Sequence, residues 1–215
     1  MLDPNQEENA RNLWQSVRNI RRSAAHLDAL MDNIKEEIDE EDFGGGETSI
    51  VGDEYDGDDW IKISRSLYAE IWTQNPKDKR KKSRQFGTIS VHLLIDDGSD
   101  ETIPSWPWRN QPSLIICWSR PEKFDEDEWD YYMYPYNFDP DDEDNLAHIK
   151  QFSCRIWRWN EGSGDRFFAI PVFSLKDERD IKKHVIKPLK KLFEGGDESD
   201  SFPDDSPVYS TDLAF

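Results

Sequence analysis

Three carboxylates come nearest, by residue type and spacing, to a catalytic site. Glu70 lies in a segment of alternating apolar and polar residues, and Asp96 and Asp97 close a second such segment. On neighbouring strands, the three carboxylates could hold Mg²⁺ in a nuclease-type site. Such a site usually adds a lysine on the same strand, whereas Ile71 and Trp72 follow Glu70. Because the chain has 46 acidic residues, carboxylates near strand ends are also expected by chance, and this enzyme is the alternative prediction.

Other catalytic patterns do not occur in the sequence. The four histidines are isolated and lack zinc-binding spacing, and there is no phosphate-binding glycine loop and no serine nucleophile elbow. Cys117 and Cys154 each lie in an apolar run, which predicts buried, unreactive thiols in a reducing compartment. The acidic run from Asp53 to Asp59 does not fit an EF-hand, because Gly52 stands where the first ligand is needed. We therefore expect no metal, no cofactor and no catalysis.

One segment between the two alternating runs is strongly basic. It is either a contact for a phosphate or an acidic partner, or a solvated hairpin tip that blunts edge pairing. Its possible anion contacts are Lys77, Lys79, Arg80, Lys81, Lys82 and Arg84.

The most regular pattern lies in residues 1–42. Apolar residues recur from Leu13 to Ile38 at alternating spacings of four and three, which is a heptad repeat. We expect a long amphipathic, coiled-coil-like helix of about 50 Å that ends before Gly44, and we expect its apolar stripe to bind a partner or a second copy. The predicted contacts on this helix are Leu13, Val17, Ile20, Leu27, Met31 and Ile34.

The rest of the chain predicts an α+β fold with a mostly antiparallel sheet. Residues 43–59 have the composition of an acidic, Gly-rich linker, 60–194 that of a globular domain, and 195–215 that of a disordered acidic tail.

Within the globular part, residues 66–73 and 86–96 alternate in polarity and predict a pair of antiparallel strands. The segments 152–159 and 167–173 predict a hairpin. A last helix is expected from Asp177 to Gly195, kinked or split by Pro188.

The net charge and the absence of certain apolar segments limit the functions that the sequence allows. A net charge of −19 argues against general binding to nucleic acid or anionic membranes. The sequence contains neither a signal peptide nor an apolar run of the roughly 20 residues that a membrane span needs, so we expect a cytoplasmic protein. The remaining alternative to an interaction protein or a nuclease is a structural subunit whose acidity keeps it soluble.

The first prediction is a non-catalytic, acidic interaction protein: an inhibitor, an immunity or antitoxin-like protein, or an accessory subunit. It would bind a protein partner through its N-terminal helix and its acidic surface, one candidate partner being a basic protein that acts on nucleic acids. The predicted acidic contacts are Asp125, Glu126, Asp127, Glu128, Asp141, Asp142 and Asp144.

Overall fold

The chain folds around one antiparallel sheet. The computed structural model describes residues 4–55, 65–73, 84–94, 111–119, 150–158 and 166–211. In this part of the chain seven strands lie in the order β1-β2-β3-β4-β7-β6-β5, and every neighbouring pair is antiparallel. The strands are β1 (Gly46–Tyr55), β2 (Arg65–Thr73), β3 (Arg84–Leu94), β4 (Ser113–Ser119), β5 (Lys150–Gln151), β6 (Trp157–Arg158) and β7 (Arg166–Pro171). The predicted α+β class and mostly antiparallel sheet are confirmed.

Alternation along the central strands directs one apolar face toward the helices. The predicted pairing of the 66–73 and 86–96 segments is confirmed by β2 and β3, which pair with Ala69 opposite Ile89. Ile89, Val91 and Leu93 are almost completely buried in the core, as a period of two requires when one face packs. Across β3 the sheet continues to β4 and β7, so the core runs over the middle of the sheet.

The opposite face of β3 is polar and is nevertheless buried. Thr88, Ser90 and His92 alternate with the apolar residues of β3 and are 8%, 3% and 0% exposed. The imidazole Nε2 of His92 lies 3.0 Å from Ser90 Oγ, and its ring packs edge-on against Tyr68 at 5.6 Å. This pairing satisfies part of the polar surface that burial removes from water.

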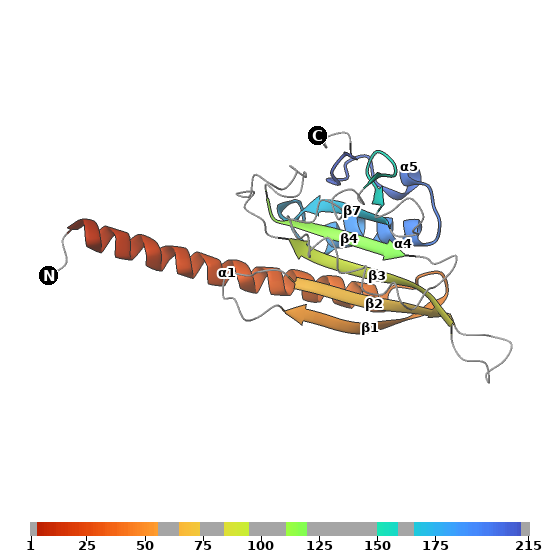
Figure 1. Ribbon diagram of the computed structural model, residues 1–215, viewed down its shortest axis with the longest axis horizontal. Coiled ribbons are helices and arrows are strands. Elements are labelled where there is room, and N and C mark those ends of the chain that lie inside the picture. The colour runs from red at the N-terminus through yellow and green to blue at the C-terminus, as the bar shows by residue number, and fades with distance from the viewer. Residues whose placement is uncertain are drawn as a thin grey trace.

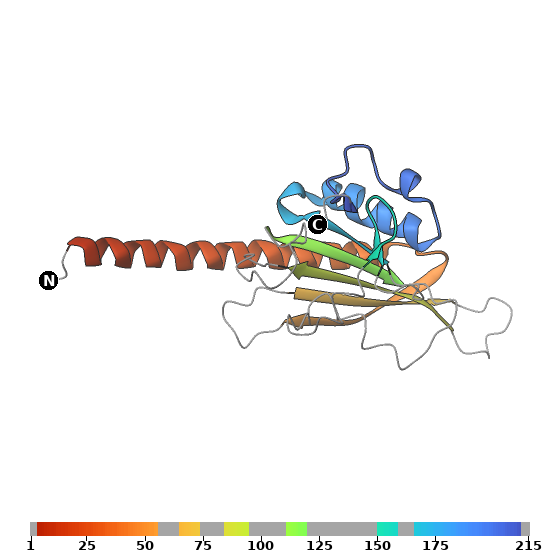
Figure 2. The same cartoon turned by 45° about the horizontal axis from the view of Figure 1, so that its top comes forward.

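Helices cover the apolar face. They are α1 (Pro4–Glu40), the short 3₁₀ turn η3 (Val172–Ser174), α3 (Glu178–Ile181), the π-helical segment η4 (Lys182–Ile186), α4 (Lys187–Phe193) and α5 (Glu198–Ser201). One end of α1 and the α3–α4 segment share a single core with the strands, and the opposite end of α1 extends well beyond the sheet (Figure 1, Figure 2).

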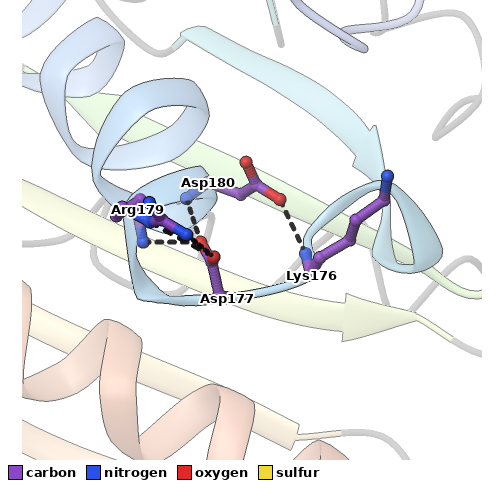
Figure 3. Close-up of polar contacts among 4 residues, drawn as sticks. All are labelled: Lys176, Asp177, Arg179 and Asp180. Atoms are coloured by element: carbon purple, nitrogen blue, oxygen red, sulfur yellow. Dashed lines mark hydrogen bonds and ion pairs between the residues drawn. The ribbon is translucent and has the colours of Figure 1, made fainter.

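The C-terminal helical segment begins and ends where its sequence predicts. The Asp177 carboxylate caps α3 by accepting hydrogen bonds from the backbone N–H groups of Arg179 and Asp180 (Figure 3). Pro188 has no N–H to donate, and the helix widens into η4 directly before it. The chain leaves α4 at Gly195, whose φ of 89° is a conformation that glycine adopts readily.

The sequence predicts a flexible linker over residues 43–59, and the structure has a strand in its place. Residues 46–55 form β1, which pairs along its length with β2. The acidic side chains suit an edge strand, because only one side of such a strand must be covered and charge discourages pairing with other chains. Ile50 packs against the core from this strand.

The predicted disordered tail, 195–215, is also ordered over its described part. Phe202 and Val208 are buried in the core, and the Phe202 ring packs edge-on against Phe168 at 5.1 Å. The backbone N–H of Tyr209 donates to the carbonyl of Ala169 in β7 at 3.0 Å. Two apolar side chains and backbone pairing therefore fix a segment whose average composition is typical of disorder.

The two cysteines lie in different environments, although the sequence predicts burial for both. Cys117 is buried in β4, as expected, whereas Cys154 is exposed. The difference arises because Cys154 does not lie in a strand: the backbone N–H groups of Phe152 and Ser153 both donate to the carbonyl of Ile156, which closes a turn. Neither cysteine forms a disulfide.

Candidate interaction surface

The helix α1 consists of two parts with different surroundings. We name residues 27–40 the docked half, because Leu27, Met31, Ile34 and Ile38 are at most 9% exposed and belong to the core. These residues are four successive members of the heptad stripe. The docked half contacts β1, β2 and η4, so the sheet and the C-terminal helical segment bury this part of the stripe.

Ion pairs with the C-terminal helical segment hold the acidic side of the docked half. Lys182 Nζ lies 2.8 Å from a carboxylate oxygen of Glu37. Beyond the end of α1, Lys190 Nζ lies 2.6 Å from Glu41. The hydrogen bond to Glu37, followed by that to Glu178, raises the pKa of Lys182, and Glu41 likewise raises that of Lys190. Both lysines therefore stay charged at neutral pH and compensate acidic residues of the helix end.

We name residues 4–26 the projecting half of α1. Every described side chain between Arg11 and His26 is exposed, apart from a half-buried Ala24. Leu13 is 67% and Trp14 60% exposed, and both are among the few large apolar side chains that the structure leaves in solvent. At 1.5 Å per residue this half is about 35 Å long. This half extends beyond the sheet (Figure 2), and its described large apolar side chains, Leu13 and Trp14, are exposed.

The structure separates the predicted helix contacts into two groups. Leu13 is available to a partner, and positions 17 and 20 continue its stripe along the projecting half by helical spacing. In contrast, Leu27, Met31 and Ile34 are buried in the core of the same chain and cannot also contact a partner. The sequence placed them in one partner-binding set because heptad spacing is the same whether a sheet or another chain covers it.

The predicted charged contacts lie almost wholly outside the described residues. This holds for the acidic contacts between 125 and 144 and for the basic contacts between 77 and 82, while Arg84 is the first residue of β3. Those contacts stay predictions.

Of the three carboxylates predicted for the alternative magnesium site, one lies within the described residues. Glu70 lies on β2, half-buried, and accepts a hydrogen bond from Trp72 Nε1 at 2.8 Å; Asp96 and Asp97 are outside the described residues. Within the described ranges no group of three or more metal-ligating side chains comes together. The indole N–H takes up one carboxylate oxygen of Glu70, and nothing described brings a second carboxylate to it.

The Ser90–His92 pair has the distance of a nucleophile and its general base. Its burial argues for another role, because a substrate must reach the serine oxygen, whereas His92 is 0% and Ser90 3% exposed. The pair lies in the middle of β3, a central strand of the sheet. It fits a satisfied polar contact within a buried strand better than a reactive centre.

Sequence reasoning did not single out the positive charge of the projecting half. Residues 9–27 contain four arginines and no Asp or Glu, whereas residues 28–42 contain eight acidic residues and one lysine. Counting charge separately for the two ends of the predicted helix would have found this reversal. The total of −19 for the whole chain conceals it.

Comparisons with known proteins identify no relative of this chain. No protein-family model, curated protein or solved structure matches this chain. Within the described residues, no helix combines the length and apolarity needed to cross a bilayer.

Proposed function

We propose that this protein is a non-catalytic interaction protein whose projecting half of α1 docks onto a protein partner. The observation that carries the proposal is the exposure of Leu13 and Trp14 on a helix that continues beyond its own core. A single exposed leucine is ordinary. Here the heptad stripe continues past the last residue that the core covers, which is typical of a helix that pairs with a second apolar surface.

Energetics support the same conclusion. An isolated helix of about this length is marginal in water, since most helical stability in proteins comes from packing an apolar face. Burying a side chain such as leucine contributes about 1.5–3 kcal/mol, and tryptophan brings a larger apolar area. A partner that covers Leu13 and Trp14 would therefore supply the packing that this half of the helix lacks.

The experiment compares the paired change Leu13→Gln/Trp14→Gln with wild type. A matched control, Gln15→Asn/Glu36→Gln, alters two exposed polar positions on the side of α1 opposite the stripe without removing apolar surface. Tagged proteins are isolated from cells that naturally express the protein, and co-purifying chains are quantified by mass spectrometry. The mass of each purified protein alone is measured by light scattering.

The proposal predicts that a co-purifying chain is retained by wild type and control and lost from the Leu13/Trp14 variant. The free energy of unfolding should change by no more than about 0.5 kcal/mol, because both positions are on the surface. If wild type and the Leu13/Trp14 variant bring down the same chains in the same amounts, the projecting half is not the docking element.

A further inference from the structure

The projecting half is positively charged in an acidic protein. Residues 4–26 carry four arginines against two carboxylates, Glu7 and Glu8, in a chain with a net charge of −19. None of the ion pairs in the described part of the chain involves Arg11, Arg18 or Arg22. The acidic side chains of the next turns differ in this respect, since Glu37 and Glu41 pair with lysines of the C-terminal helical segment. Among the described side chains, Arg11, Arg18 and Arg22 therefore carry positive charge that no ion pair compensates.

Helical spacing places this charge along one side of the apolar stripe. Arg11, Trp14, Arg18 and Arg21 follow one another at intervals of three, four and three, so they share a flank of the helix. The Arg18 guanidinium lies 5.3 Å from the Trp14 ring, a cation–π distance.

The other flank of the stripe is neutral. Its members are Asn12, Ser16, Asn19 and Ser23, and Ser16 Oγ donates to the carbonyl of Asn12 at 2.9 Å. The surface thus combines a narrow apolar stripe with one basic edge and one uncharged edge.

From this arrangement we infer that the partner presents an acidic amphipathic helix: an apolar stripe of heptad spacing with carboxylates beside it. This inference rests on the proposed function and specifies the chemistry of the docking partner. The heptad stripe suits a helix, whose knobs repeat with the same period. Carboxylates at its flanking positions would lie against Arg11, Arg18 and Arg21, and charged flanks are what sets the choice and orientation of partner in paired helices.

Other occupants fit these observations less well. A second copy would bring two helices of net positive charge together, because residues 4–26 contain four arginines and only two carboxylates, Glu7 and Glu8. Its acidic docked half is unavailable because the stripe there is buried. An anionic membrane or a nucleic acid would attract the arginines but would repel the remainder of a chain with 46 acidic residues.

The test uses two synthetic peptides of four heptads with Ile and Leu at the core positions. One carries Glu at both flanking positions and the other, its charge-swapped twin, carries Lys. Binding of each labelled peptide to the full-length protein is measured by fluorescence anisotropy over a salt series. Three variants are compared with wild type: four arginines to Gln (Arg11, Arg18, Arg21, Arg22), the same four to Glu, and a control that removes four exposed positive charges elsewhere (Lys176, Arg179, Lys187 and Lys191 to Gln).

We expect the Glu peptide to bind wild type and the control at least about tenfold more tightly than the Lys peptide, with an affinity that falls as salt rises. The change of four arginines to Gln should remove the preference, and the change to Glu should reverse it in favour of the Lys peptide. The reversal distinguishes a specific charged flank from general attraction between an apolar stripe and any helical peptide.

Three results would overturn the inference. Equal binding of the two peptides would show that charge does not select the partner. Tighter binding to vesicles containing about 30% anionic lipid than to the Glu peptide would identify a membrane as the occupant. A stable dimer of wild type that persists in the four-Gln variant would identify a second copy. Each result leaves the proposed function standing if the Leu13/Trp14 variant still loses its co-purifying chain, so the two proposals fail separately.

Discussion

The two halves of α1 share one heptad stripe and have opposite surroundings. In the docked half, Ile34 and Ile38 are 0% exposed and the nearby acidic side chains pair with lysines. In the projecting half, Leu13 and Trp14 remain in solvent beside arginines for which no ion pair is described. The same spacing therefore serves a core in one half and, as we propose, a partner in the other. The difference lies in what covers the stripe, together with the charges on either side of it.

The largest contrast between the halves is expected from truncating one stripe residue in each. Ile34→Ala should lower the free energy of unfolding by about 2–5 kcal/mol, because it leaves a cavity in a packed core. Leu13→Ala should change it by no more than about 0.5 kcal/mol. Urea denaturation monitored by tryptophan fluorescence measures both. Similar losses in the two variants would mean that the projecting half is also packed within its own chain.

The second-largest difference between the two halves is expected in the rates of amide hydrogen exchange. Amides of the projecting half open by local fraying, whereas those of the docked half need the core to open. We expect peptides from residues 8–22 to exchange at least about a hundredfold faster than peptides from residues 30–40, as measured by mass spectrometry on the protein alone. Addition of the Glu peptide should slow the first group and leave the second unchanged. Equal protection of both groups in the free protein would abolish the distinction.

Lowering the pH is expected to have a smaller effect on the free energy of unfolding, and this effect should arise in the docked half alone. His184 lies in η4, which contacts α1, and is 6% exposed with no partner for Nδ1. Burial, together with the charge of Lys183, lowers the pKa of His184, while Asp205 and Asp180 act in the opposite direction. The imidazole of the unfolded chain is therefore protonated as the pH falls through about 6.5, whereas that of the folded chain is still neutral at that pH. The contribution of His184 to the free energy of unfolding is therefore fully present above this pH and is lost progressively below it.

The corresponding experiment follows the free energy of unfolding between pH 7.5 and 5.5. Wild type should lose stability over this range, and His184→Gln should lose less. The helicity of the projecting half should not depend on the change in pH. A wild-type profile as flat as that of His184→Gln would show that the imidazole is protonated without cost in the folded protein.

The smallest expected effect concerns the ion pair that fixes the end of the docked half. A double-mutant cycle with Lys190→Met and Glu41→Gln should give a coupling free energy of about 0.5–1 kcal/mol, because the pair is partly exposed. Raising the salt concentration should reduce the coupling. A coupling of zero would show that the Lys190–Glu41 ion pair does not help to hold this end of α1.

The sequence determined local features that depend on neighbouring residues along the chain. The end of α1 before the glycines at 44 and 45, the alternation of β2 and β3, the Asp177 cap and the disturbance next to Pro188 all follow from backbone preference or from periodicity. Of the candidate site, the sequence supplied the stripe and its members. These are short-range properties, and the side-chain pattern alone expresses them.

Tertiary structure decided which surfaces are covered. It placed an acidic segment at the edge of the sheet as β1, fixed the tail through Phe202 and Val208, and left Cys154 exposed in a turn. It also set the boundary of the core on α1 at Leu27, so that the stripe is buried from Leu27 onward and has an exposed side chain at Leu13. The physical reason is that burial depends on residues distant in the chain: the same apolar period forms wherever a complementary surface lies, and only the folded sheet shows how far along α1 that surface extends.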